Sequence, residues 1–395
     1  MSKKYIFFTG VALLMSLSVA KAQEAEILSQ VEKNNTELQA LRKRIDSEKY
    51  GYKAERALEA PEVGFDYLWG SPADIGNRKD ISVTQSFDIA ALSGIRRKVS
   101  ESKSGLSDLS YSLNRQRILL EARQICIRLI WCNAMDAELS SRLALSAEIE
   151  KVCKEMFARG EIDVIETNKA HIAYLSQKNA YSRNMTEKQE LLSELQRLNG
   201  GEYIEFTESS YDTPVMLPAD FNVWYAEASQ KSPELKYANR NVEVNAAEAK
   251  TIKMANWPTL KAGYMAELVK GSNFRGLTVG LAIPLWSVRS RTRQANCLLE
   301  TAKLDEKDVK AQTYTRLKGL YEKAVGLKSM SDELSSSLVT AQEAMALTRK
   351  KFEDGEISLL DNIMELGLYY AIVDESLAVS RDYLLAYSEL NSWSL

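Results

Sequence analysis

Side chains that could carry out chemistry are few in this sequence. The chain has one histidine, His171, which falls in the middle of a helix-patterned segment. No His or Cys pair has the spacing of metal ligands, and Gly200-Gly201 is a helix stop without the Lys-Ser/Thr of a phosphate-binding loop. We therefore expect no enzyme, no metal site and no cofactor.

The cysteines are the remaining candidates for reactive groups. Cys126, Cys132, Cys153 and Cys297 all lie in helix-patterned segments. Cys126 and Cys132 are six residues apart, which directs them to different faces of one helix. We expect all four to be small buried hydrophobic residues.

The most informative residues surround two related glycines. The segment Phe157-Ala-Arg-Gly-Glu-Ile-Asp is matched by Phe352-Glu-Asp-Gly-Glu-Ile-Ser, so that Gly160 corresponds to Gly355, 195 positions later. Each glycine interrupts a long helical pattern and can adopt a left-handed backbone without a Cβ clash. The pattern predicts a turn between two helices at each glycine.

The residues that follow each glycine support the same interpretation. Asp163 and Ser358 can cap the next helix by accepting a bond from its free amides. Glu166 and Asp361 then place a carboxylate in the first turn of that helix. The sequence predicts two equivalent helical hairpins, at 93–198 and 290–395.

The elements around these hairpins follow one order twice. Helical patterns cover 24–58, 93–158, 163–198, 291–353 and 358 to the terminus, and Ser232-Pro233 begins another. Alternating patterns predict strands at 62–70, 80–89, 259–268 and 276–286, with Gly271-Ser272-Asn273 as a loop. The offset between matching landmarks stays near 195 residues, which predicts an internal duplication.

These landmarks divide the chain. We expect a first structural repeat over 23–200, a linker over 201–218 and a second repeat over 219–395. The segments 24–58 and 163–198 together match the length of the long helix 93–158, so they would stack end to end beside it.

Apolar residues of the first long helix form two stripes about 140° apart. Two stripes suit a helix with a neighbour on each side, as in the wall of a cylinder; the alternative is an apolar helix buried in a bundle. The second long helix has one seam. The stripes are Leu113, Leu120, Ile127 and Ala134, and Ile118, Ile125, Cys132 and Leu139; the seam runs through Leu320, Ala324, Leu327, Ser331, Leu334, Leu338, Ala341, Met345 and Phe352.

The N-terminus has the pattern of an export signal. Lys3 and Lys4 precede an apolar run that ends in Ala20-Lys21-Ala22, which predicts a signal peptide over 1–22. No later stretch is apolar for the roughly 18 residues that a transmembrane helix needs. A net charge of −3 excludes nucleic-acid binding by electrostatics.

The four predicted strands have the length of tilted membrane strands and alternate apolar with polar or small residues. Four strands cannot close a barrel, and an open edge cannot exist in lipid. Two chains would supply eight strands, whose interior side chains fill, and three would supply twelve, enough to leave an opening. The fold class we predict is mainly α with four antiparallel strands, in a sheet that several subunits must complete.

The ordered set of turns and strands resembles the TolC-like outer-membrane efflux factor family over the mature sequence. The residues that carry the likeness are the two glycine turns and the strand end Gly280-Leu-Ala-Ile-Pro-Leu-Trp286. The resemblance implies a homotrimer with a twelve-stranded barrel in outer-membrane lipid, continuous with a periplasmic helical tunnel. It also implies docking to a periplasmic adaptor protein and an inner-membrane transporter.

In that family the helical tips meet the adaptor and close the tunnel entrance. The adaptor contacts map to Gly160, Glu161, Ile162, Gly355, Glu356 and Ile357. The entrance constriction maps to Phe352, Asp361, Glu166 and Met364. The best-studied member latches its tips with Tyr and Arg where this chain has Phe352 and Ile357, so we expect closure by apolar packing of Phe352 and one acidic ring from Asp361. The alternative is that these carboxylates simply face solvent.

Three functions fit these features. The resemblance favours a passive exit duct that carries substrate from a pump to the cell exterior. The main alternative is a periplasmic adaptor or scaffold with long helical hairpins, and a third is protein secretion through the same kind of duct.

Overall fold

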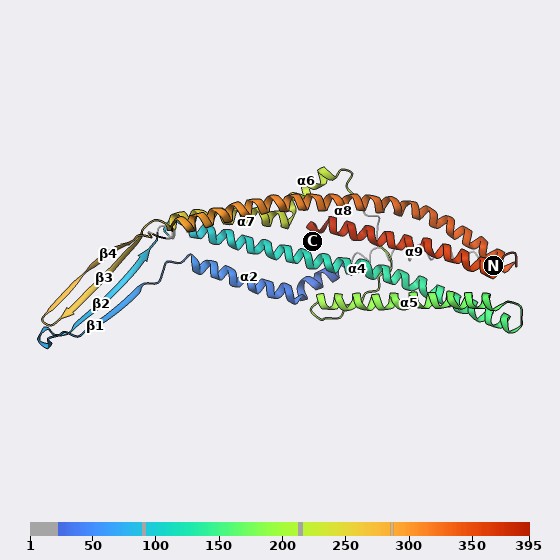
Figure 1. Cartoon of the computed structure of the whole chain (residues 1–395), viewed down its shortest axis with the longest axis horizontal. Helices are drawn as coiled ribbons and strands as arrows, with labels where there is room; N and C mark the ends of the chain where they lie inside the picture. Colours follow the sequence, from blue (N-terminus) through green and yellow to red (C-terminus); the bar gives the residue numbers. More distant parts are fainter. Residues whose placement is uncertain (1–22, 89–91, 212–215, 285, 287) are drawn as a thin grey trace. The chain divides into compact units, whose positions relative to one another are not determined.

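The computed structural model describes residues 23–88, 92–211, 216–284, 286 and 288–395. The expected signal peptide lies outside these residues, as does Ile89 at the end of a predicted strand. A helix over 23–34 is followed by α2 (Thr36–Glu55), β1 (Glu62–Leu68), η1 (Ala73–Ile75), β2 (Arg78–Phe87), α4 (Ile95–Ala158), α5 (Val164–Leu198), α6 (Phe221–Lys231), α7 (Pro233–Ala255), β3 (Thr259–Val269), β4 (Ser272–Ala282), α8 (Val288–Glu353), α9 (Leu359–Leu390) and η2 (Ser392–Ser394) (Figure 1).

The chain divides into two compact units. The helical unit comprises the chain up to Gln39, Asn114–Ala228 and Tyr314–Leu395, and the sheet unit comprises Ala40–Leu113 and Ser229–Thr313. The long helices α4 and α8 contribute to both. No helix within the described ranges is long and apolar enough to span a lipid bilayer.

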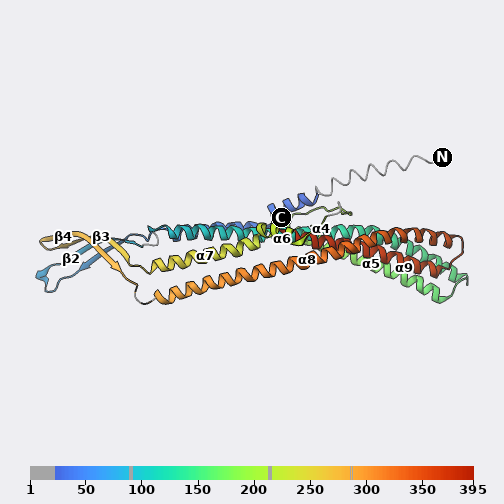
Figure 2. The ribbon, with the colours of Figure 1, turned by 90° about the horizontal axis from the view of Figure 1, so that it is seen from above.

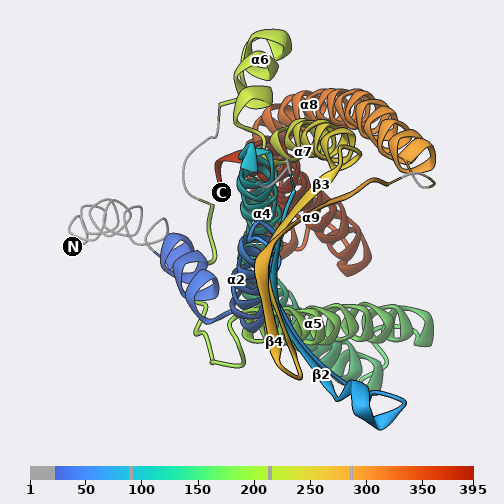
Figure 3. The same cartoon turned by 90° about the vertical axis from the view of Figure 1, so that its left-hand side faces the viewer.

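The sheet unit contains one four-stranded antiparallel sheet in the order β1-β2-β3-β4. The two predicted hairpins are therefore joined by pairing between β2 and β3, from Lys79 opposite Leu268 to Phe87 opposite Leu260. Figure 3 shows the sheet nearly edge-on as a curved layer. Edge strands β1 and β4 each have one side without a partner strand among the described residues.

The predicted strand bounds were partly wrong. The expected loop Gly271-Ser272-Asn273 is a two-residue turn, because Gly271 takes a φ of 83° and β4 starts directly at Ser272. This turn moves β4 from the predicted 276–286 to Ser272–Ala282, two residues short of Pro284, which has no amide hydrogen to donate. The first strand ends at Leu68 rather than residue 70, and the second starts at Arg78 rather than residue 80.

The helical unit contains two helical hairpins, as predicted. α5 returns along α4 and α9 returns along α8, and Figures 1 and 2 place both turns at the same end of this unit. Asp163 caps α5 by accepting a bond from the Glu166 amide, and Ser358 caps α9 by accepting one from the Asp361 amide. The caps that the sequence predicted are confirmed.

The apolar stripes of the long helices pack as their spacing indicated. The stripe Ile118, Ile125, Cys132 and Leu139 is buried, and the second α4 stripe is buried or half-buried. On α8, Ala324 is buried and the other seam residues are half-buried. Ala324 packs with Tyr383 and Ala386 of α9.

The predicted helix over 24–58 is interrupted at Asn35. The Asn35 Oδ1 accepts a bond from the Leu38 amide at 2.9 Å, so Asn35 begins a new helix rather than continuing the old one. Asn35 Nδ2 also donates to the Leu198 carbonyl at 2.8 Å, and a Cβ on Gly200 would lie 2.4 Å from the Asn34 carbonyl oxygen. The C-terminal end of α5 therefore contacts the chain at Asn34 and Asn35. This contact is expected if the segments 24–58 and 163–198 stack end to end.

The prediction for the cysteines was right for three of the four. Cys126, Cys132 and Cys153 are buried, whereas Cys297 is exposed. Ala295 is buried on α8, and a position two residues later points to the opposite side of a helix. The exposure of Cys297 follows from this register.

Candidate functional site: two helical turns and an amphipathic sheet

The two glycine turns have the same backbone geometry. Gly160 has a φ of 73° and Gly355 a φ of 75°. At the first turn the Gly160 amide bonds the Phe157 carbonyl at 2.9 Å and the Glu161 amide bonds the Met156 carbonyl at 3.0 Å. Each turn thus closes its long helix with a Schellman motif, which needs a left-handed residue at the glycine position.

The second turn has the same backbone hydrogen bonds, but different side chains cap the helix that follows it. The Gly355 amide bonds the Phe352 carbonyl at 3.1 Å, and the Glu356 amide bonds the Lys351 carbonyl at 2.8 Å. Ser358 and Asp361 complete a capping box, with Ser358 Oγ donating to Asp361 Oδ2 at 2.7 Å. Asp361 is exposed, and its carboxylate accepts a hydrogen bond from the Ser358 hydroxyl.

The first turn carries an ion pair that the sequence analysis did not single out. Arg159 Nε lies 2.7 Å from Glu161 Oε1, and Arg159 Nη2 lies 3.1 Å from Glu161 Oε2. This two-point contact lowers the pKa of Glu161 below its ordinary value. An Arg two residues before a Glu across a tight turn was the signal that could have revealed it.

The remaining tip residues differ in exposure. Glu356 is exposed, and Ile162, Ile357, Phe352 and Glu166 are half-buried. Met364 is 62% exposed on α9. Within the described residues, no hydrogen bond or ion pair joins 157–166 to 352–361, and the roles of the predicted constriction residues stay predictions.

Behind the turns, one buried arginine connects the two hairpins. Arg142 of α4 is 3% exposed, and its Nη1 lies 2.8 Å from Asp374 Oδ1 of α9. Its guanidinium carbon lies 4.3 Å from the ring centroid of Tyr370, whose pKa is raised by burial. Arg142 sits three residues after buried Leu139, so a charge within an apolar stripe was the signal that could have found it.

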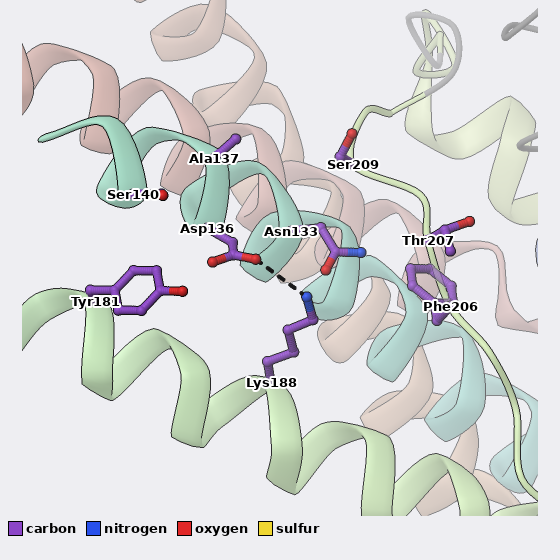
Figure 4. Close-up of a pocket in the computed structure, with 9 residues that line it drawn as sticks. All are labelled: Asn133, Asp136, Ala137, Ser140, Tyr181, Lys188, Phe206, Thr207 and Ser209. Atoms are coloured by element: carbon purple, nitrogen blue, oxygen red, sulfur yellow. Dashed lines mark ion pairs between the residues drawn. The ribbon is translucent and has the colours of Figure 1, made fainter. Parts of the chain in front are cut away.

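A pocket of about 540 Å³ lies between α4, α5 and the segment 206–209 (Figure 4). Lys188 Nζ reaches across from α5 to Asp136 Oδ2 on α4, at 3.5 Å. These charges compensate each other, so the pocket presents no net charge to a ligand. The pocket is lined by Asn133, Asp136, Ala137, Ser140, Tyr181, Lys188, Phe206, Thr207 and Ser209.

The histidine forms part of a small polar contact between α4 and α5. His171 Nδ1 lies 2.6 Å from Glu150 Oε1, and Lys154 Nζ lies 2.7 Å from the same oxygen. These partners lower the pKa of Glu150, Lys154 more than His171. In the portion of the chain that the structure describes, no group of three or more His, Cys, Asp and Glu side chains is arranged to hold a metal ion.

The sheet has one apolar and one polar face. Cross-strand pairs Phe65–Ile81, Val83–Tyr264 and Ala262–Val279 place their side chains on the first face. The exposed side chains on this face include Phe65, Leu277, Val279 and Leu281, the last three at 86%, 76% and 66%. No described element covers this face of the isolated chain.

The opposite face is small and polar. Its central positions are Gly64, Ser82, Thr84, Gly263, Gly276, Thr278 and Gly280, with Met265 as the one large apolar side chain among them. Near the loop end, Arg78 Nε bonds Asp80 at 2.8 and 2.9 Å, and Arg78 also pairs with Glu267 across the strands. The charge of Arg78 on this face is therefore compensated within the chain.

Comparisons with known proteins identify the fold. No family model matches the sequence, and no curated protein matches it. Among solved structures, the chain is similar to CusC (12% identity, TM-score 0.78, 94% of this chain and 92% of that one). It is similar to the CmeC outer membrane channel of Campylobacter jejuni (13% identity, TM-score 0.77, 94% and 85%).

A third similar structure is the open state of the MtrE outer membrane channel of Neisseria gonorrhoeae (15% identity, TM-score 0.70, 94% and 88%). The CusC crystal structures concern the conformational changes that accompany folding and transmembrane channel formation of that protein. The likeness extends over almost the whole chain and includes both hairpins and the sheet. The chain therefore has the fold of the TolC-like outer-membrane channels.

Proposed function

We propose that this chain is one subunit of an outer-membrane exit duct of a tripartite efflux or secretion system. The observation that carries the proposal is the sheet, which exposes a continuous apolar face while its opposite face is small and polar. In water that apolar face would favour aggregation. In lipid it is the expected surface of a membrane strand, and the fold similarity supports the same conclusion.

The duct is a homotrimer in this proposal. Edge strands β1 and β4 need partners in lipid, because unpaired backbone groups are costly there. Three four-stranded sheets give a twelve-stranded barrel with a water-filled interior, lined by the polar face. The helical hairpins of three chains would form a periplasmic tunnel below it.

Matching caps support the inferred duplication of the chain. Asn35 caps α2 through the Leu38 amide, and Ser232 caps α7 through the Leu235 amide, 197 residues further on. The Schellman turns at Gly160 and Gly355 are also matched. We infer two repeats, 23–200 and 219–395, joined by a linker over 201–218.

The glycine turns are the proposed contacts with a periplasmic adaptor, through Gly160, Glu161 and Ile162 and through Gly355, Glu356 and Ile357. An inner-membrane transporter would supply the work, and the duct itself would be passive. Phe352, Glu166, Asp361 and Met364 are the proposed entrance residues. Since Asp361 is exposed and keeps a free carboxylate oxygen, it can still contribute one acidic ring to the entrance.

Membrane fractionation of the full chain tests the proposal against the adaptor alternative. We expect the protein in the outer-membrane fraction, as an oligomer that dissociates only on heating in detergent. A water-soluble folded monomer would contradict it.

Single-channel recording then tests the entrance. We expect Asp361→Asn to weaken block by divalent cations, with Glu365→Gln beside it as the matched control. Unchanged cation block in Asp361→Asn would remove Asp361 from the constriction.

A further inference from the structure

The apolar face of the sheet carries two cations, both near the loops that join β1 to β2 and β3 to β4. The strand register places Lys79 opposite Tyr67 and Leu268 in one row, and Arg275 opposite Ala266 in the next row. Among the strand positions that the structure describes, these are the charged residues on this face. The rows beyond them, toward the helices, hold Val63, Val83, Tyr264, Leu277, Gln85, Ala262, Val279, Phe87, Leu260 and Leu281.

Neither cation has an acidic partner in the described chain. Lys79 and Arg275 are exposed, and neither forms an ion pair with any described carboxylate. Arg78, next to Lys79 but on the opposite face, is instead paired with Asp80 and Glu267. The chain thus compensates Arg78 on its polar face, whereas Lys79 and Arg275 on its apolar face have no acidic partner among the described residues.

One of these cations is held in place by aromatic neighbours. Lys79 Nζ lies 5.7 Å from the ring centroid of Tyr67, and Asn77 Nδ2 donates to the Tyr67 hydroxyl at 2.6 Å. Tyr67 in turn packs edge-on against Trp69, with ring centroids 5.3 Å apart. Aromatic side chains of this kind gather at the level of lipid head groups.

We propose that Lys79 and Arg275 bind the phosphate groups of an anionic lipid at the rim of the barrel. The inference rests on the proposed function, because it requires the apolar face to lie in lipid. Lys79 and Arg275 lie two strands apart and in adjacent rows of this face, so two strand spacings of about 4.8 Å and a two-residue step along the strand separate their Cα atoms by about 12 Å. Two long side chains extended from these positions can contact one phosphorylated head group.

The head-group level is where such a contact would be strongest. Just beyond the apolar rows, a cation is partly removed from water and has phosphate oxygens as its available anions. A guanidinium binds phosphate with two parallel hydrogen bonds, and an ammonium binds it as a point charge. The same groups on the polar face would meet water and dissolved ions instead.

Native mass spectrometry of the full-length oligomer tests the proposal. The oligomer is titrated with phosphatidylglycerol or phosphatidylcholine in mixed micelles, with and without inorganic phosphate. We expect the wild-type protein to prefer the anionic lipid. We expect Lys79→Gln/Arg275→Gln to lose that preference by roughly 10- to 30-fold.

Lys261→Gln is the matched control, because Lys261 lies on β3 but faces the polar side, opposite Gly280. It should keep the lipid preference. An unchanged preference in the double variant overturns the lipid site, as does an equal loss in the control or complete displacement of the lipid by inorganic phosphate.

Oligomerisation separates this outcome from failure of the proposed function. All three proteins should form the same heat-dissociable oligomer with the same conductance. If the wild-type chain forms no membrane-inserted oligomer, the proposed function fails, and the lipid site fails with it. If the oligomer inserts normally and shows no lipid preference, the lipid site alone fails.

Discussion

The sheet unit and the helical unit treat apolar side chains in opposite ways. In the helical unit, Ile118, Leu129 and Leu195 are fully or almost fully buried within one chain. In the sheet, Leu277 and Val279 are more than three-quarters exposed. The helical unit thus contains its own hydrophobic core, whereas the sheet lacks the surroundings that its composition requires.

This difference indicates what stabilises each unit. In the helical unit, burial of apolar side chains between helices stabilises the isolated chain. In the proposed duct, the sheet would gain that contribution from lipid and from neighbouring chains. Substitutions in the sheet should therefore reduce membrane assembly, whereas substitutions in the helical unit should reduce the thermal stability of the chain.

The largest effect is expected on the apolar face of the sheet. Val279→Lys should reduce the membrane-inserted oligomer more than tenfold, because a cation at the lipid midplane costs about 2–4 kcal/mol in each chain. Heat-modified migration of the outer-membrane fraction measures it. Thr278→Lys, one residue away on the polar face, should assemble nearly normally; equal loss in both variants would contradict the assignment of the faces.

A core substitution in the helical unit should act on the chain itself. Leu195 is 0% exposed, so Leu195→Ala should lower the free energy of unfolding by about 2–5 kcal/mol. Thermal melting of the helical signal measures the change. Leu347→Ala, at an exposed position on α8 in the same unit, should stay within about 0.5 kcal/mol. A melt as sensitive to Leu347 as to Leu195 would mean that the helical core lies elsewhere.

The two helix caps should differ by a smaller amount. Ser358→Ala removes the hydroxyl half of the capping box and leaves the Asp361 carboxylate to accept from the amide of residue 358, whereas Asp163→Ala removes the whole of a one-sided cap. Each should cost about 1 kcal/mol, with Asp163 the more costly of the two. Amide hydrogen exchange in the first turns of α9 and α5 provides the comparison, and equal opening of both turns would show that the second half of the box contributes nothing.

The smallest effect is expected at the polar contact of the helical unit. Lys154 and His171 lower the pKa of Glu150, so its ionised form stabilises the fold above the ordinary Glu pKa. That contribution is lost as the pH falls from about 5 through the lowered value. Glu150→Gln should flatten the pH dependence of unfolding in this range only, and an unchanged slope in acid titration would exclude the contact as its source.

Much of the local structure was predictable. Gly160 and Gly355 require a left-handed backbone, and Asp163 and Ser358 offer oxygen atoms to free amides, so both turns follow from their own residues. The errors in the bounds of the elements have local reasons too. A two-residue turn at Lys270-Gly271 looks much like a longer loop when only the sequence is read, and Asn35 resembles any polar residue on a helix face.

The candidate site was less predictable, because its contacts connect distant residues. Arg142 and Asp374 are far apart in the chain, and no spacing rule pairs them. The Asp361 carboxylate was predicted to form an acidic ring, and the sequence analysis did not foresee that one of its oxygens accepts a bond from the Ser358 hydroxyl. The predicted roles of Glu166, Phe352 and Met364 depend on other chains and stay predictions.

By itself the sequence determined the periods, the turns and the caps, since each depends on backbone preferences and neighbours within a few residues. Only the tertiary structure decided which strands pair and in what register. That register aligned Lys79 and Arg275 on one face and Arg78 with two acids on the other. Side-chain alternation has a period of two, so a shift of one residue would have exchanged the two faces.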